Sequence, residues 1–230
     1  MTSQVYRLLE DYMLSCMGDS AHDKEHIYRV LYSALEIAGE EEQEVDFDVL
    51  ICACLLHDVG RREQFEDPSL CHARVGAEKA YRFLVEQGFE EEFAARVRHC
   101  IQTHRYRSNH EPETPEARIL FDADKLDVTG TIGIARTLFY KGRVSEPLYT
   151  VDEQGRVQDG SGDTEPSFLK EYKYKLENIY SHFYTKKGAE MARARRQAAE
   201  SYYRSLLEEV RPLYEKGRQA LAGRVTDSAE

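Results

Sequence analysis

The chain has 230 residues, 41% of them hydrophobic, and carries a formal net charge of −11. This length and composition indicate one globular domain and exclude an intrinsically disordered chain. The acidic balance argues against nucleic acid or an anionic membrane as a partner, and no apolar run approaches the roughly 18 residues needed to span a bilayer.

The periodicity of apolar residues predicts helices throughout, and no segment has the alternation typical of a strand. The expected helices are residues 3–17, a segment from near His26 to Ala38, one from a cap at Asp46 or Asp48 to Gly60, and segments 72–88, 90–104, 115–141, 167–184 and 188–214. Residues 142–167 are rich in Gly, Asp, Ser and Pro and are expected to form a long loop.

One apolar run, Val49–Leu56, leads directly into His57 and Asp58. Its length and continuity favour a buried helix, and Gly60 suits the left-handed residue that follows a last turn. Burial of an imidazole and a carboxylate is costly unless something binds them, and a divalent cation would do so. The alternative is a core histidine bonded to its neighbours, beside an aspartate that ends the helix.

Further polar side chains fall on apolar faces of other predicted helices. The complete set, drawn from five helices, is His26, His57, Asp58, His72, His104 and Asp124. Imidazole and carboxylate together suit Mn, Fe, Co, Zn or Mg, and the absence of thiolate partners disfavours a purely structural zinc site. A mixed N/O site with open coordination positions is typical of catalysis. For His26 alone, a packed core histidine is an equally good interpretation.

Three segments resemble the HD-domain metal-dependent phosphohydrolases, in particular the stand-alone bacterial members. They are HIYRV at 26–30, LLHDVG at 55–60 and DADKLD at 122–127. The resemblance implies an all-α helical bundle of the HD type and a divalent metal cation as cofactor. The metal ligands that it implies are His26, His57, Asp58 and Asp124.

The resemblance is closest over residues 20–140 and extends loosely to about residue 210. It implies a single domain over residues 1–215, with the metal site in 20–140 and C-terminal helices in 167–215 packed on that core. The loop at 142–167 is either solvent-exposed or a lid over the site. Residues 216–230 are expected to be a frayed tail.

The function that the resemblance implies is hydrolysis of phosphate ester or anhydride bonds in nucleotides, and nucleoside triphosphate pyrophosphohydrolases occur in this branch. Asp58 would hold the metal and steer the attacking water. Lys125, His104 and either Arg61 or Arg62 would contact the phosphate oxygens and stabilise developing charge. For each arginine, an ordinary surface charge in a polar loop is an equally good interpretation.

His72 and His104 fit positions at which two-metal relatives carry further histidines. A second histidine that follows directly in the best-known two-metal branch is replaced here by Arg105. The two histidines are therefore expected to be either ligands of a second metal or phosphate contacts.

The same sequence features are compatible with other functions. The chain could be a 5′-nucleotidase, a dinucleoside polyphosphate hydrolase or a metal-dependent nucleotide sensor without turnover. An intact ligand set favours catalysis, since a sensor needs no open metal position. A purely structural bundle would bind no metal.

Five cysteines are present, and Cys52 and Cys54 lie inside the apolar run. An odd count without CxxC pairs favours buried thiols over a disulfide framework. The N-terminus also lacks the basic and apolar regions of a signal peptide. We therefore expect a cytoplasmic protein whose partner is a small phosphorylated substrate.

Overall fold

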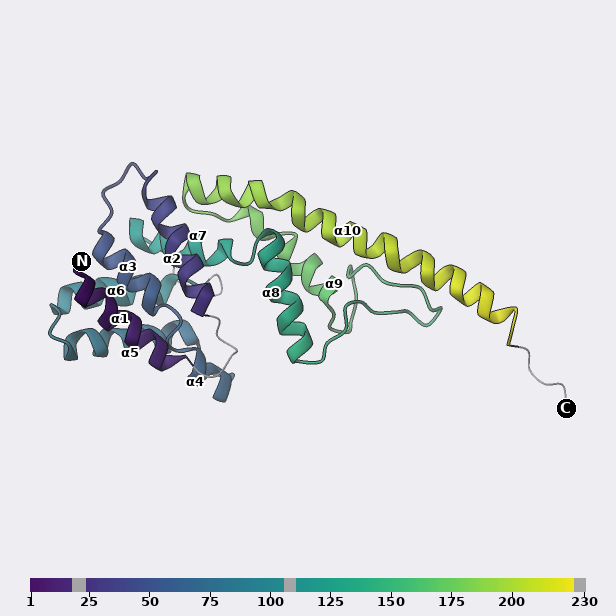
Figure 1. Ribbon diagram of the computed structural model, residues 1–230, viewed down its shortest axis with the longest axis horizontal. Coiled ribbons are helices and arrows are strands. Elements are labelled where there is room, and N and C mark those ends of the chain that lie inside the picture. The colour runs from purple at the N-terminus through teal and green to yellow at the C-terminus, as the bar shows by residue number, and fades with distance from the viewer. Residues whose placement is uncertain (18–23, 106–110, 226–230) are drawn as a thin grey trace. The chain divides into compact units, whose positions relative to one another are not determined.

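The computed structural model describes residues 1–17, 24–105 and 111–225. These residues form helices and loops, and the one β feature among them is an isolated bridge between Val151 and Val157, so the expected all-α class is confirmed. The α-helices, labelled in Figure 1, are α1 (Ser3–Cys16), α2 (Lys24–Ala38), α3 (Phe47–Leu56), α4 (Arg61–Glu66), α5 (His72–Glu86), α6 (Glu91–Thr103), α7 (Pro115–Leu126), α8 (Gly130–Arg143), α9 (Phe168–Glu171) and α10 (Lys186–Ala222).

The chain divides into two compact units. The first comprises Met1–Asp127 and His182–Met191, and the second comprises Val128–Ser181 and Ala192–Glu230. The expectation of one domain over residues 1–215 stays a prediction. Of the expected metal-site core, residues 20–23 and 106–110 lie outside the described residues.

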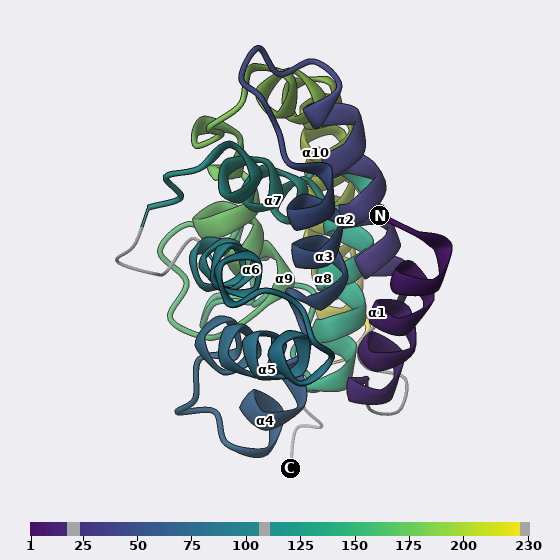
Figure 2. The same ribbon diagram turned by 90° about the vertical axis from the view of Figure 1, so that its left-hand side faces the viewer.

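Helix α3 is the central helix of the first unit and packs against α1, α2, α6 and α7 (Figure 2). Asp46 caps it, because its carboxylate accepts the N–H groups of Asp48 and Val49 at 3.0 and 3.2 Å. All residues of the run Val49–Leu56 except Ile51 are buried. The buried helix predicted from the apolar run is therefore confirmed, and it ends immediately before His57.

Gly60 allows the turn after α3 to lie directly on α5. Its φ is −98°, so the left-handed conformation expected for it was wrong. A Cβ atom at this position would lie 2.4 Å from the carbonyl oxygen of His72 and 2.5 Å from the amide nitrogen of Gly76. The absence of a side chain thus brings His57 and Asp58 next to the start of α5.

We expect Gly60→Ala to lower the free energy of unfolding by about 3 kcal/mol, because the new methyl group meets backbone atoms that cannot rotate away. For a chain of this size, the melting temperature should fall by roughly 6–12 °C. Thermal unfolding followed by circular dichroism measures this change. Gly142→Ala is the matched control, since nothing lies within 4 Å of a Cβ there. Equal melting temperatures for the two variants would contradict the argument.

The segment expected as one helix over residues 115–141 is two helices, α7 and α8. Gly130 has a φ of +59°, which an α-helix cannot continue through. A Cβ atom at Gly130 would lie 2.8 Å from the Cβ of Arg195, so a larger residue is excluded. The break follows Asp127, where the first unit gives way to the second.

Two other segments also differ from expectation. Arg61 and Arg62 begin the short helix α4, where a polar loop was expected. Residues 167–184 form no single helix: α9 is followed by a π-helical turn, Tyr172–Leu176, and a 3-10 turn, Ile179–Ser181.

Side chains of α7 bind the backbone of residues 182–185 and so hold it outside a helix. The carboxylate of Asp122 accepts the N–H groups of Tyr184 and Thr185 at 3.0 and 2.7 Å. The ammonium group of Lys125 donates to the carbonyl of His182. Asp122 is fully buried, and the N–H groups of Tyr184 and Thr185 satisfy its carboxylate inside the first unit.

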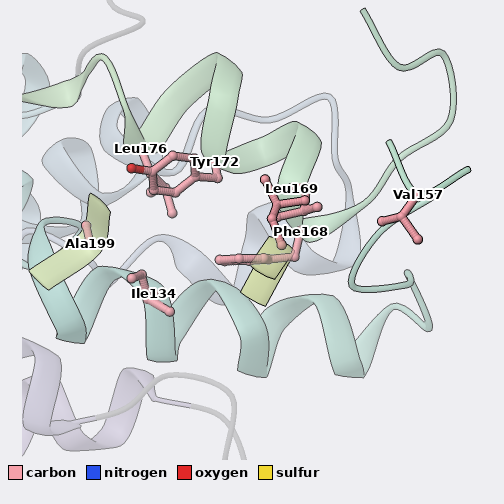
Figure 3. Close-up of a cluster of buried hydrophobic side chains, with 8 residues drawn as sticks. Ile134, Val157, Phe168, Leu169, Tyr172, Leu176 and Ala199 are labelled. Carbon is pink, nitrogen blue, oxygen red and sulfur yellow. The ribbon is translucent and has the colours of Figure 1, made fainter. Parts of the chain in front are cut away.

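The second unit has an apolar core of its own (Figure 3). Its buried members are Ile134, Val157, Phe168, Leu169, Tyr172, Leu176, Ala199 and Leu207. The loop after α8 contributes Val157 to this core. A role for this loop as a lid stays a prediction. Helix α10 continues to Ala222, past the point at which a frayed tail was expected, and residues 226–230 lie outside the described residues.

All five cysteines are free, and Cys52, Cys54 and Cys100 are buried, as the sequence predicted. Within the described ranges, each helix is too short or too polar to cross a membrane.

Candidate metal centre

His57 is held at the end of α3 with one ring nitrogen facing the interior. Its Nδ1 lies 2.7 Å from the carbonyl oxygen of Cys54. A carbonyl can only accept, so Nδ1 carries the hydrogen and the neutral ring has its lone pair on Nε2. Burial lowers the pKa of His57 to about 4, against the opposing effect of Asp58. The imidazole is therefore neutral at pH 7, the form that binds a metal.

His26 enters from α2 and faces His57. Its Nδ1 lies 2.7 Å from an oxygen of Asp127, whose carboxylate is bound in turn by Arg29 at 2.7 and 3.1 Å. This contact places the hydrogen on Nδ1 and directs the lone pair of Nε2 inward. The two Nε2 atoms of His26 and His57 are 3.4 Å apart. Two lone pairs that face each other in a buried site repel unless a cation lies between them.

Two carboxylates complete this first group of ligand atoms. Nε2 of His26 is 3.5 Å from Oδ2 of Asp58 and 3.3 Å from Oδ1 of Asp124, and Nε2 of His57 is 3.8 Å from each of these oxygens. Ligand atoms bound about 2.1 Å from one cation lie roughly 3.0–3.4 Å apart. Five of the six pairs among the four predicted ligands thus lie 3.3–3.8 Å apart, near the spacing of a coordination sphere.

The charges of the two carboxylates are favoured despite their burial. Burial alone would raise the pKa of Asp58, but the adjacent guanidinium of Arg61 holds it well below its usual range. The pKa of Asp124, whose carboxylate lies beside the ring of His26, is also lowered despite its burial. The side chain of Asp124 is 24% exposed, against 6% for Asp58. Solvent therefore reaches the centre from the Asp124 side.

A second group of ligand atoms shares Asp58. His72 at the start of α5 and His104 after α6 place their Nε2 atoms 3.6 and 3.9 Å from Oδ1 of Asp58. Both Nε2 atoms are buried without a hydrogen-bond partner among the described residues. Their Nδ1 atoms contact Oε1 of Gln64 at 2.8 Å and the carbonyl of Ile101. Both unpaired atoms are therefore lone pairs, which is what a cation requires.

Of the cations predicted at the site, the structure brings one to Asp58. Nε of Arg61 donates to Oδ1 of Asp58 at 2.9 Å. Arg62 forms an exposed ion pair with Glu66 at 3.0 Å, which fits the surface-charge interpretation. Lys125 follows Asp124 directly in α7, so its side chain leaves the helix about 100° around the axis from that of Asp124. Its ammonium lies 4.9 Å from the centre of the Phe183 ring. Phosphate contacts by Arg62 and Lys125 stay predictions.

The sequence reasoning missed the residues that orient the histidines. Asp127 is 3% exposed and binds His26, yet no role was assigned to it. Its offset of three residues from Asp124 was the available signal, because that spacing places both carboxylates on one side of a helix. Gln64 carried no comparable signal, since its contact with His72 depends on how α4 turns back toward α5.

Comparison with known proteins gives consistent matches. Residues 24–129 match the HD domain model. The chain is 35% identical to the uncharacterized protein YpgQ of Bacillus subtilis over 140 residues, which span 59% of this chain and 64% of that protein.

Solved structures of similar fold cover most of the chain. The crystal structure of YpgQ in complex with ADP matches with a TM-score of 0.68 and 27% identity, over 89% of this chain and 97% of that one. An HD-superfamily hydrolase from Bacillus thuringiensis matches with a TM-score of 0.68 and 25% identity, over 90% and 96% of the two chains. Together with the paired ligand atoms of His57 and Asp58, these matches identify residues 24–129 as similar to an HD domain and support a place for the chain in the HD-domain superfamily.

Proposed function

We propose that this protein is a metal-dependent phosphohydrolase that cleaves a phosphate ester or anhydride bond of nucleotides, with nucleoside triphosphates as the first candidates. One observation carries the proposal: two groups of buried lone pairs meet at the single carboxylate of Asp58. Such an arrangement is costly to bury unless cations bind it. The complex of the similar protein YpgQ with ADP supports a nucleotide as the substrate class.

A divalent cation bound here would activate water and neutralise charge on the phosphate. The protein's own part is to hold the ligand atoms in fixed directions. The Nδ1 contacts of His26, His57, His72 and His104 fix their rings so that all four Nε2 atoms face Asp58 or its neighbours. The partly exposed Asp124 marks the side from which a substrate phosphate would enter.

The hydrogen positions favour a cation over a phosphate at the second group. A neutral imidazole whose hydrogen lies on Nδ1 cannot donate from Nε2 to a phosphate oxygen. Burial, followed by the charge of Arg61, lowers the pKa of His72 to about 2, so this ring is neutral at pH 7. We therefore assign His72 and His104 to a second metal position rather than to direct phosphate contact.

The test is a panel of nucleoside triphosphates, nucleoside monophosphates and dinucleoside polyphosphates with Mn²⁺ or Co²⁺ and product identification. We expect a nucleoside monophosphate and pyrophosphate from a triphosphate, with no product after chelation of the metal. Phosphate from monophosphates would identify a 5′-nucleotidase, and cleavage only of dinucleoside polyphosphates the corresponding hydrolase. Nucleotide binding without any product would indicate a sensor and contradict the proposed activity.

A further inference from the structure

Oxygen Oδ1 of Asp58 lies within reach of both an arginine and a pair of histidines. The guanidinium of Arg61 donates to this oxygen at 2.9 Å, while the unpaired Nε2 atoms of His72 and His104 lie 3.6 and 3.9 Å away from it. A metal ion held by the two histidines would need the same oxygen. A cation already binds the carboxylate that a second metal requires.

The two metal positions also differ in the charge that surrounds them. The first has Asp58 and Asp124 as ligands and the carboxylate of Asp127 behind His26. The second has only its share of Asp58, and its histidines are backed by neutral groups, an amide and a carbonyl. A carboxylate behind a ligating histidine increases the basicity of the ring, so the first position is the stronger.

The placement of Arg61 suits it for exchange with an ion. Its backbone N–H donates to the carbonyl of Asp58 at 3.0 Å, which keeps the two residues together in the turn after α3. Its side chain is 31% exposed, whereas that of Asp58 is 6% exposed. The guanidinium can therefore turn into water and leave the carboxylate in place, since an arginine stays charged and hydrated there.

We propose that Arg61 is a built-in competitor of the second metal ion at Asp58 and makes metal loading sequential, with one ion bound tightly and a second bound weakly. The inference rests on the metal centre of the proposed function. It gives Arg61 a positioning role toward Asp58 that differs from contact with substrate phosphate. Electrostatic repulsion between guanidinium and ion acts in the same direction as the competition for Oδ1.

The experiment is calorimetric titration of the metal-free protein with Mn²⁺ alone, without nucleotide. In Arg61→Gln, the affinity of the second step should rise at least about 10-fold, because a charge-assisted hydrogen bond no longer has to be broken. The first step should change less, and Arg61→Lys, which keeps the charge, should resemble the wild type. Arg62→Gln is the matched control, since it removes a neighbouring arginine whose partner is the exposed Glu66.

A second variant tests whether the gain in Mn²⁺ affinity arises at the position of His72 and His104. Adding His72→Ala to Arg61→Gln should remove the strengthened second step. A second step of equal affinity in wild type and Arg61→Gln would overturn the inference, and so would a gain that survives His72→Ala. Either result leaves the first step and the proposed function intact. Absence of any Mn²⁺ binding by the folded wild type would instead refute the metal centre itself.

Discussion

Replacing Asp58 with alanine is expected to abolish tight Mn²⁺ binding and to lower nucleotide turnover at least about 1000-fold. Within the described residues, both candidate ligand groups include this carboxylate, so its removal weakens both metal positions at once. The helices should persist, because α3 is stabilised by its apolar residues and ends before Asp58. Metal binding by calorimetry, turnover and far-UV circular dichroism measure the three effects.

The matched control for this change is Asp11→Ala, which removes an exposed aspartate from α1. It should leave metal binding and turnover unchanged. Undiminished turnover in Asp58→Ala would refute the assignment of the centre. Loss of helical signal in that variant would show a structural role for Asp58, and the assignment would then rest on the metal affinity of the isosteric Asp58→Asn.

The substitution Asp127→Asn is expected to weaken Mn²⁺ binding at the first position about 10- to 100-fold. The asparagine oxygen can still accept the Nδ1 hydrogen of His26, so the ring keeps its direction. The negative charge that raises the basicity of this ring and pairs with Arg29 is lost. Titration of the metal-free variant with Mn²⁺ measures the change in affinity.

Asp152→Asn provides the comparison, because it neutralises an aspartate paired with an arginine, Arg156, in the loop of the second unit. It should leave Mn²⁺ affinity within error of the wild type. Equal affinities for wild type and Asp127→Asn would mean that the contact at 2.7 Å only packs the ring. A similar loss of affinity in both variants would point to a general charge effect.

Sequence periodicity predicted the positions of the helices and missed their interruptions. The run Val49–Leu56 is apolar on every side, so it could only be buried. Its place in the sequence predicted a cap at Asp46 or Asp48, and the structure shows that Asp46 is the cap. The breaks depend on partners distant in sequence. Gly130 is left-handed beside Arg195, and residues 182–185 leave the helical path because Asp122 and Lys125 bind their backbone.

In the metal centre too, the sequence predicted some features and the tertiary structure decided others. Helical spacing placed six polar side chains on apolar faces, and the family resemblance implied that His26, His57, Asp58 and Asp124 are the metal ligands. The structure brings the ligand atoms of these four residues to distances of 3.3–3.8 Å in five of their six pairs. Arg61 and Arg62 were indistinguishable in sequence. Only the turn after α3 directs one toward Asp58 and the other toward Glu66.

The sequence by itself determined that this protein is all-helical, that a histidine–aspartate pair follows its most apolar segment, and that several further polar side chains lie on apolar helix faces, because these properties depend on local spacing and hydrophobicity. The tertiary structure alone decided which ring nitrogen of each histidine is free and that Asp58 serves two groups of ligands. It also decided that Asp127 and Arg61 act on the centre. Hydrogen-bond direction depends on atoms from different helices, and no spacing along one helix specifies it.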